Sequence, residues 1–395
     1  MEITLNKEQK LLRHNASEFL ARLKNTDLCG QNLEVDSAKS RSLLIAMATQ
    51  GWFSILVPSR AGGLGLGVTD LALVMEIAGK GLFMDPIAEF AVAAWAISVG
   101  DSATGLGSLL VKLMAGEQLI LPVINEYQEK DHEQTGLVST NEHHGYQLSG
   151  NKLIVPFPVS PDYYLVDAST QDGTLIYVVP SKNVDLNFER NHKNSDLRRE
   201  ILRIPGIFLN EDALVSGRKE GAQMASNIFD RILLANVGRY LGLAEVTLNS
   251  ASDHLKMLAD KNDFIEEANI INLHLKSIAV LHKKLRFFLF KTCRVIDNGN
   301  GNRLMVAEVA TASCRLGAYF SKFEGEIQRT LPISSEHFLM QLLKQVIPLS
   351  QRYGTLDEHQ KRAKRLILEQ EKRAISKERN RRKKRRRSIF SKINN

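Results

Sequence analysis

The chain has 395 residues, of which 44% are hydrophobic, and its three cysteines are Cys29, Cys293 and Cys314. This length suits two or three domains with a large core, and three widely spaced cysteines provide neither a disulfide framework nor a metal-ligand motif. The polar N-terminus lacks the apolar segment of a secretory signal, and no apolar run reaches the length of a membrane span. We therefore expect a cytoplasmic protein.

The formal net charge of +8 comes from one end of the chain. Residues 361–395 contain 16 Lys and Arg but only 3 Asp and Glu. Of the 52 basic and 44 acidic residues in the chain, 36 and 41 therefore lie in residues 1–360. The first 360 residues are mildly acidic, so the basic end has to be interpreted separately from the rest.

The first part of the chain, residues 1–117, has a helical pattern. Apolar residues such as Leu12, Phe19 and Leu23 recur at helical spacing. Helices are also predicted in residues 38–50, 70–79, 87–99 and 105–115. Residues 51–67 are rich in glycine and are predicted to form turns rather than a nucleotide loop, because Val68 occupies the third glycine position of a dinucleotide motif.

The remainder of the chain changes pattern twice. Short apolar runs separated by turn residues predict strands in residues 118–219. Long helical patterns follow in residues 220–354, with a glycine- and asparagine-rich break at residues 298–302. This order predicts an α+β fold: an N-terminal helical domain, a central β domain and a C-terminal four-helix bundle. Residues 355–395 are expected to form a basic, disordered tail.

Several motifs occur in one order along the chain. Gly51-Trp52, Val57-Pro58, Asp70 and Glu76 are followed by the KLMAGE segment at residues 112–117 and by GYQLSGNK at residues 145–152. Taken together with residues 196–198 and 214–217, they resemble the acyl-CoA dehydrogenase family. The resemblance implies an FAD-linked oxidoreductase that carries out α,β-dehydrogenation of a CoA thioester.

The resemblance also implies a catalytic carboxylate. In the family, a carboxylate removes the α-proton of the thioester and flavin accepts a hydride. One base position is a Glu before an Arg on the first long C-terminal helix, and Asp230 precedes Arg231 in that frame. A first-turn acidic residue that favours the helix dipole is the alternative interpretation of Asp230. The other base position is a Glu-Gly-Thr loop. Glu324-Gly325 resembles it only superficially, because a further helix is predicted afterwards.

The FAD-contacting motifs are altered. In the frame of the family's Arg-x-Gln-Phe-Gly and Phe-Gln motifs, the chain has Lys261 and Asn272 as cofactor-binding candidates. Ile154 and Val155, followed by Pro156, stand where the family flanks the flavin ring. In the family, FAD lies at a subunit interface. The resemblance therefore implies a homo-oligomer, or a hetero-oligomer with another acyl-CoA dehydrogenase-like subunit in which this chain is weakly catalytic.

The basic tail suggests a further contact. Residues 379–387 contain eight basic residues and Asn380, and residues 379–395 are predicted to contact a polyanion, either nucleic acid or anionic membrane lipid. A non-enzymatic binding protein that keeps the fold and uses this tail is the alternative function. The neighbouring His143 and His144 are expected to end a hairpin, so no metal site is predicted.

Overall fold

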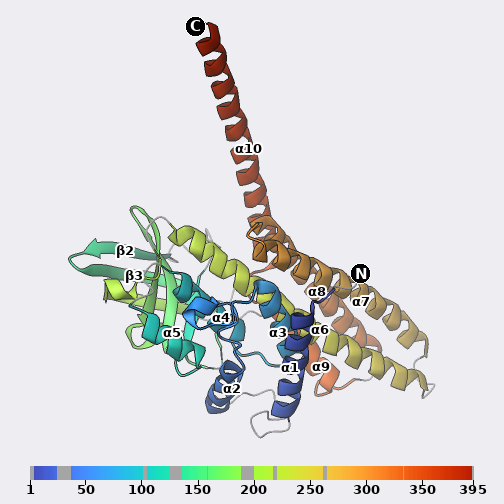
Figure 1. Cartoon of the computed structure of the whole chain (residues 1–395). Helices are drawn as coiled ribbons and strands as arrows, with labels where there is room; N and C mark the ends of the chain where they lie inside the picture. The colour runs from blue at the N-terminus through green and yellow to red at the C-terminus, as the bar shows by residue number, and fades with distance from the viewer. Residues whose placement is uncertain are drawn as a thin grey trace.

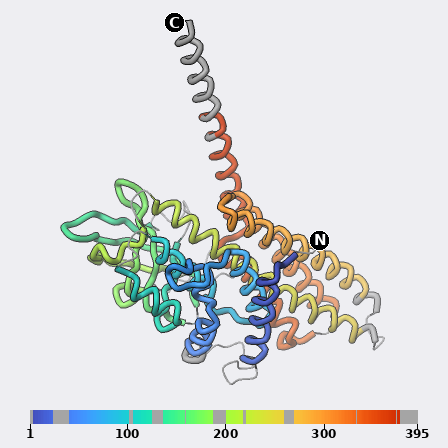
Figure 2. Tube along the Cα trace, in the orientation of Figure 1, coloured from blue at the N-terminus to red at the C-terminus, as the bar shows by residue number. Residues whose placement is uncertain are grey.

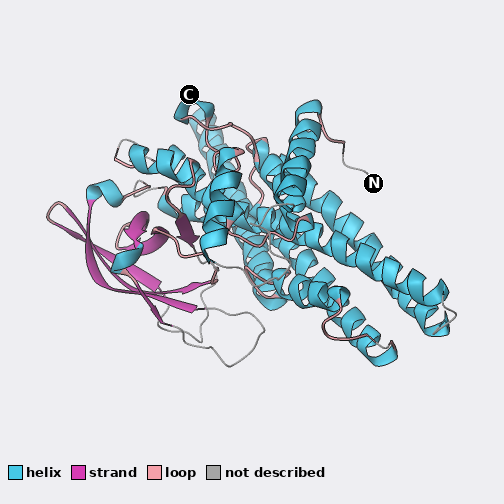
Figure 3. Cartoon of the chain, turned by 90° about the horizontal axis from the view of Figure 1, so that it is seen from below, coloured by secondary structure: helices cyan, strands magenta, loops and turns pink. Residues whose placement is uncertain are grey.

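The computed structural model describes residues 4–24, 37–100, 105–124, 136–157, 159–187, 200–216, 220–260, 265–331 and 333–393. Helices at the N-terminus, a sheet and long C-terminal helices follow one another along the chain (Figure 1). Figure 3 shows the sheet at one end of the molecule and the long helices extending away from it. The predicted α+β fold class is confirmed.

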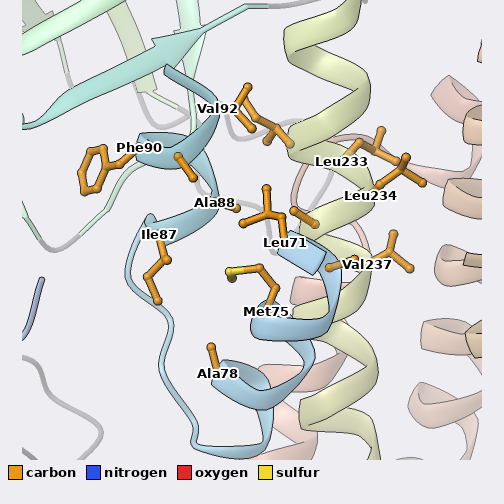
Figure 4. Packing of buried hydrophobic residues seen from close by; sticks show 14 of the residues in the cluster. Leu71, Met75, Ala78, Ile87, Ala88, Phe90, Val92, Leu233, Leu234 and Val237 are labelled. Carbon is orange, nitrogen blue, oxygen red and sulfur yellow. The ribbon is translucent and has the colours of Figure 1, made fainter. Parts of the chain in front are cut away.

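The N-terminal helices contribute to the centre of the core. They are α1 (Lys7–Lys24), α2 (Ser37–Thr49), α3 (Val68–Lys80), α4 (Ile87–Val99) and α5 (Gly107–Met114). Helices α3 and α4 are buried on nearly every side, because their sequences are apolar around the whole circumference. Several of their side chains pack toward the next long helix of the chain, as Leu71 and Val92 do in Figure 4, while Phe90 points to the opposite side of α4.

The described part of the β region forms one seven-stranded sheet. Its strands are β1 (Ile120–Val123), β2 (Gly136–Glu142), β3 (Gly145–Ile154), β4 (Tyr163–Thr170), β5 (Gly173–Pro180), β6 (Asp185–Asn187) and β7 (Glu200–Asn210). The order is β1-β4-β2-β3-β7-β6, with β5 paired to β4. Strand β3 is central, pairing antiparallel with both β2 and β7, and its far end points the segment after Ile154 toward the C-terminal helices.

Four helices form the C-terminal bundle: α6 (Gly221–Asp260), α7 (Ile265–Asp297), α8 (Arg303–Thr330) and α9 (Phe338–Leu349). Helix α6 is the axis of the fold, since it contacts α3, α4, α7, α8, α9 and β5. Its approach to α3 depends on glycine. A Cβ at Gly242 would lie 2.0 Å from the backbone oxygen of Glu76, so only glycine permits this helix spacing.

The C-terminal region differs from the expected disordered tail. A single helix, α10 (Leu356–Ile393), begins directly after the bundle. Its first turns belong to the fold, because His359, Arg362 and Leu366 are buried against the bundle. These three positions have helical spacing, but two of them are polar residue types, which concealed the amphipathic pattern in the sequence. These first turns of α10 therefore pack with the bundle, and the boundary at residue 355 stays a prediction.

Beyond its first turns, α10 leaves the rest of the protein. From Ile367 to Ser376, every side chain that the structure describes is exposed. The helix projects away from the bundle in Figure 1, and Figure 2 traces the same departure. Within the described residues, no helix is both long and apolar enough to span a membrane.

Candidate functional site

Asp230 lies on the first half of α6 and is buried, with 5% of its surface exposed. Its Oδ1 accepts a hydrogen bond from Nη2 of Arg362, a residue of α10. Its other oxygen, Oδ2, lies 3.7 Å from Nε of Arg303, the first residue of α8. Three separate helices thus meet at one carboxylate, which faces two guanidinium groups.

The Arg362 side chain fills the space beside this carboxylate. It is fully buried, and its guanidinium carbon lies 5.1 Å from the centre of the Phe229 ring. Burying two opposite charges costs hydration, which their contact offsets only while both partners stay in place. Asp230 is therefore paired by this chain's own C-terminal helix, and an incoming ligand would have to compete with Arg362 for Oδ1.

A polar cleft of about 770 Å³ opens next to Asp230. Its walls come from α6, from the turn between α7 and α8, and from α10, and they include Asn227, Asp230, Arg231, Gly301, Arg303 and Glu369. Arg231 is fixed at this wall, because its guanidinium stacks 3.8 Å from the centre of the Trp95 ring and donates to the backbone oxygen of Asn227. Burial lowers the pKa of Arg231, while nearby Asp230 and Asp297 oppose that shift.

A second group of buried polar side chains lies between α4, α6 and the segment after α9. Glu89 Oε1 accepts hydrogen bonds from Nδ2 of Asn236, at 2.9 Å, and from the Tyr353 hydroxyl. Its Oε2 lies 3.7 Å from Nη2 of Arg239, a side chain that is fully buried. Burial raises the pKa of Tyr353 well above its usual range, so this phenol stays protonated. A small cavity of about 20 Å³ beside Asn236 and Tyr353 leaves room for a single water-sized molecule.

The loop that contains Tyr353 continues as Gly354-Thr355 and leads into α10. Thr355 accepts a hydrogen bond from the Glu358 backbone nitrogen, and Glu358 accepts one from the Thr355 nitrogen at 2.6 Å. This reciprocal capping box fixes the start of α10. This loop was not among the predicted site residues. The feature that marks it in the sequence is the Gly354-Thr355 pair between the last apolar helix and the charged one. The Glu324-Gly325 pair considered instead lies inside α8.

The candidate cofactor residues that the structure describes are buried or half-buried and lie on or next to two elements, β3 and α7. Ile154 is buried at the end of β3, Val155 is half-buried, and Asn272 is half-buried on α7. Lys261 lies outside the described residues. Their cofactor-binding roles stay predictions.

The segment after β3 is held by the C-terminal part of the same chain. Arg352 donates from Nη2 to the Pro156 oxygen at 3.2 Å, and its guanidinium stacks 4.1 Å from the centre of the Phe157 ring. A flavin ring needs backbone hydrogen-bonding groups beside it. Pro156 has no N–H to donate, and its carbonyl oxygen already accepts a hydrogen bond from Arg352. The described residues of this chain therefore do not fit a complete FAD site. Among those residues, no group of three His, Cys, Asp or Glu side chains could hold a metal ion.

Comparison with known proteins explains this architecture. Residues 6–131 match the model of the acyl-CoA dehydrogenase N-terminal domain. No curated protein sequence matches the chain significantly. The ChsE4–ChsE5 complex from Mycobacterium tuberculosis is similar in structure, with a TM-score of 0.76 and 17% identity over 93% of this chain and 99% of that chain. Residues 6–131 therefore match the acyl-CoA dehydrogenase N-terminal domain family, and the chain as a whole has the acyl-CoA dehydrogenase-like fold.

Two further structures place the acyl-CoA dehydrogenase fold in context. PigA with FAD and proline has a TM-score of 0.73 and 17% identity, covering 93% of this chain and 99% of that chain. Glutaryl-CoA dehydrogenase from Mycobacterium smegmatis has a TM-score of 0.71 and 16% identity, covering 90% of this chain and 93% of that chain. The predicted resemblance to the superfamily is confirmed by the match of the N-terminal domain and by the fold. At these low sequence identities, the structural relatives show the fold alone.

Two places in the described chain bear on the predicted base. After α9, a Gly-Thr pair is preceded by the half-buried Tyr353, whose hydroxyl donates a hydrogen bond to Glu89. The alternative position on the first long helix holds Asp230, which is paired with Arg362. Its assignment as the catalytic base stays a prediction, and the contacts favour a structural role.

Proposed function

We propose that this chain is a weakly catalytic subunit of an FAD-linked, acyl-CoA dehydrogenase-type hetero-oligomer that dehydrogenates a CoA thioester. The observation that carries the proposal is the buried pair of Asp230 and Arg362. A general base must reach the proton it removes and must be free to accept it. In this chain the carboxylate is occupied by a cation from α10, so the proton-accepting group has to come from another subunit.

The second base position supports the same division of labour. The Tyr353 hydroxyl donates a hydrogen bond to Glu89, and burial raises the pKa of Tyr353, so the phenol keeps its proton. Glu89 itself is occupied by Asn236 and lies beside Arg239. These groups link α4, α6 and the segment after α9, and Glu89 Oε2 lies beside Arg239 without a hydrogen bond of its own. In this proposal the buried network stabilises the bundle rather than reacting with the substrate.

The surface of α7 supports assembly with a partner. Ile270, Leu273 and Val280 are 59%, 62% and 51% exposed, and they lie on one side of the helix at a spacing of three and seven residues. Asn272 lies within this stretch. Apolar side chains gathered on one helix face are typical of subunit interfaces. The structural relatives include two-component assemblies, ChsE4–ChsE5 and Tcur3481–Tcur3483, the second described as a steroid acyl-CoA dehydrogenase. We therefore place FAD at an interface where the partner supplies most contacts.

The cleft beside Asp230 is our candidate for the polar arm of the CoA thioester. Arg231 and Arg303 bring two guanidinium groups to its wall, and Asn227 brings an amide. Guanidinium groups suit phosphate oxygens, and amides suit the peptide-like links of a pantetheine arm. In this arrangement the chain would bind and orient the ligand through Arg231, Arg303 and Asn227, and FAD held mainly by the partner would supply the oxidising chemistry.

A spectrum and a variant test the proposal. We expect the chain purified alone to lack the flavin absorption band at about 450 nm, and the co-expressed hetero-oligomer to show it. The double variant Asp230→Asn with Arg362→Gln replaces the ion pair by two amides. We expect it to keep turnover within about threefold, because removing a true general base costs roughly 10²–10⁴-fold.

Flavin content and oligomer mass are measured for both proteins, so that a folding defect is not mistaken for a catalytic one. A chain that binds FAD and turns over alone, and loses activity in the double variant with its flavin intact, would restore Asp230 as the base. A colourless preparation, even with every homologous partner co-expressed, would favour the non-enzymatic binding protein. The closed networks at Asp230 and Tyr353 are compatible with that second function.

A further inference from the structure

The C-terminal helix carries a charge that the dehydrogenase fold does not use. Residues 361–395 hold 16 of the 52 basic residues of the chain and only 3 of its 44 acidic ones. The other 360 residues are mildly acidic, so the two parts attract opposite partners. Helix α10 spans nearly all of this basic region.

The position of α10 makes this charge available. Arg362 and Leu366 anchor its first turns in the bundle, through the ion pair to Asp230 and through apolar packing. From Ile367 onward, the described side chains up to Ser376 are exposed on every side of the helix. A helix without tertiary contacts is only marginally stable in water, and like charges at helical spacing weaken it further. An anionic partner would remove that repulsion.

The residue pattern distinguishes among anionic partners. Residues 376–388 contain no apolar residue, and eight of the nine positions from 379 to 387 are basic. Successive helix positions turn by about 100°, so nine of them occupy the whole circumference. A membrane surface presents anions on one side and rewards a continuous apolar face. The major groove of duplex DNA is about 12 Å wide, admits a helix and has phosphates along both walls.

Two other partners fit the pattern poorly. A second copy of this chain offers only a mildly acidic body, with 41 acidic and 36 basic residues in positions 1–360, and lacks the closely spaced phosphates of a duplex. Single-stranded nucleic acid is recognised by base stacking on aromatic side chains, and residues 361–389 contain none. We propose that the C-terminal half of α10 binds double-stranded DNA through its phosphate backbone, without reading base sequence. This binding is separate from the proposed oxidoreductase function and does not depend on it.

The test measures binding of the full chain to a fluorescein-labelled DNA duplex of mixed sequence, roughly 20 base pairs long. If six phosphates are contacted, affinity should fall about 10³-fold between 50 and 200 mM salt. Truncation after Ser376 should weaken binding at low salt by at least about 100-fold, because non-specific binding is electrostatic. Replacing Arg381, Arg382, Lys383 and Lys384 by Gln should make the slope of log affinity against log salt shallower by about 3.6.

A matched variant separates DNA from membrane. Replacing Ile389, Phe390 and Ile393 by Ser removes the apolar residues at the end of the chain and keeps its charge. We expect duplex binding to be unchanged. The proposal is overturned if the truncated chain binds the duplex as well as the full chain does. It is also overturned by tighter binding to phosphatidylserine vesicles that the Ser variant loses, or by tighter binding to an RNA duplex of equal length.

Discussion

Asp230 and Arg362 lie 132 positions apart in the sequence and form an ion pair whose side chains are 7% and 0% exposed. The pair joins the axial helix of the bundle to the first turns of α10. It therefore has two consequences. It gives the Asp230 carboxylate a cationic partner from α10, and it fixes the point from which the basic part of α10 leaves the protein.

Arg362→Met should strongly destabilise the protein. The methionine fills much of the same space, but it removes the ion-pair partner of the buried Asp230 carboxylate, whose Oδ2 stays 3.7 Å from Nε of Arg303. Losing one partner of a buried pair lowers the free energy of unfolding by about 3–5 kcal/mol. Urea unfolding followed by circular dichroism measures the change.

The neighbouring Lys361 provides the control. Its side chain is 75% exposed and pairs with Asp357 one turn earlier on α10. Lys361→Met should change the free energy of unfolding by less than about 0.5 kcal/mol. Adding Asp230→Leu to Arg362→Met should recover part of the lost stability, because the uncompensated charge disappears. Equal losses in the Arg362 and Lys361 variants would show that the buried pair does not support the fold.

Gly242→Ala should force α3 and α6 apart. The new Cβ would meet the Glu76 oxygen at 2.0 Å and the Lys80 nitrogen at 2.8 Å, and both are backbone atoms that cannot turn away. We expect a loss of roughly 1–3 kcal/mol in the free energy of unfolding. Gly325→Ala is the matched change in α8, where a Cβ meets nothing within 4 Å, and it should stabilise the protein by about 0.5–1 kcal/mol. Stabilisation by both changes would contradict the close helix packing.

Tyr353→Phe should destabilise the protein by about 1–3 kcal/mol, because the buried Glu89 loses a hydrogen-bond donor. Thermal or urea unfolding measures the change, with Tyr319→Phe as the control. Tyr319 is 47% exposed, so its replacement should stay within about 0.5 kcal/mol. If the two variants are equally stable, the Tyr353 hydroxyl contributes nothing to the closed network.

His282 should make stability depend on pH. Burial lowers its pKa below the usual value, with a smaller lowering from Arg286, while the Leu241 hydrogen bond and nearby Glu245 and Glu76 oppose the shift. The unfolded chain therefore binds a proton at a higher pH than the folded protein does. As pH falls below about 6.5, the unfolded state is favoured and stability is lost down to the folded-state pKa.

His282→Gln isolates this contribution. The stability difference between the wild type and the variant, measured by urea unfolding at several pH values, should fall as the pH drops below about 6.5. Other titrating groups are common to both proteins and cancel in the difference. A difference that stays constant over this pH range, or that grows as pH falls, would show that His282 does not titrate in the expected direction.

The sequence by itself determined the order of the parts. Helical spacing of Phe19 and Leu23, strand runs after residue 118 and long helical patterns after residue 220 are local properties of the chain, so they predicted the α+β class without knowledge of contacts. The same motifs identified the superfamily and the position of Asp230 on the first long C-terminal helix.

Only the tertiary structure decided what surrounds those residues. Asp230 could act on a ligand if it faced one, whereas beside Arg362 it is one half of an ion pair. The two residues are far apart in sequence, so only the packing of the helices sets the distance between them. The burial of the first turns of α10 could not be predicted for a related reason. A charge is stable inside a protein only when it is paired, so the sequence does not reveal that Arg362 is buried unless its partner Asp230 is known.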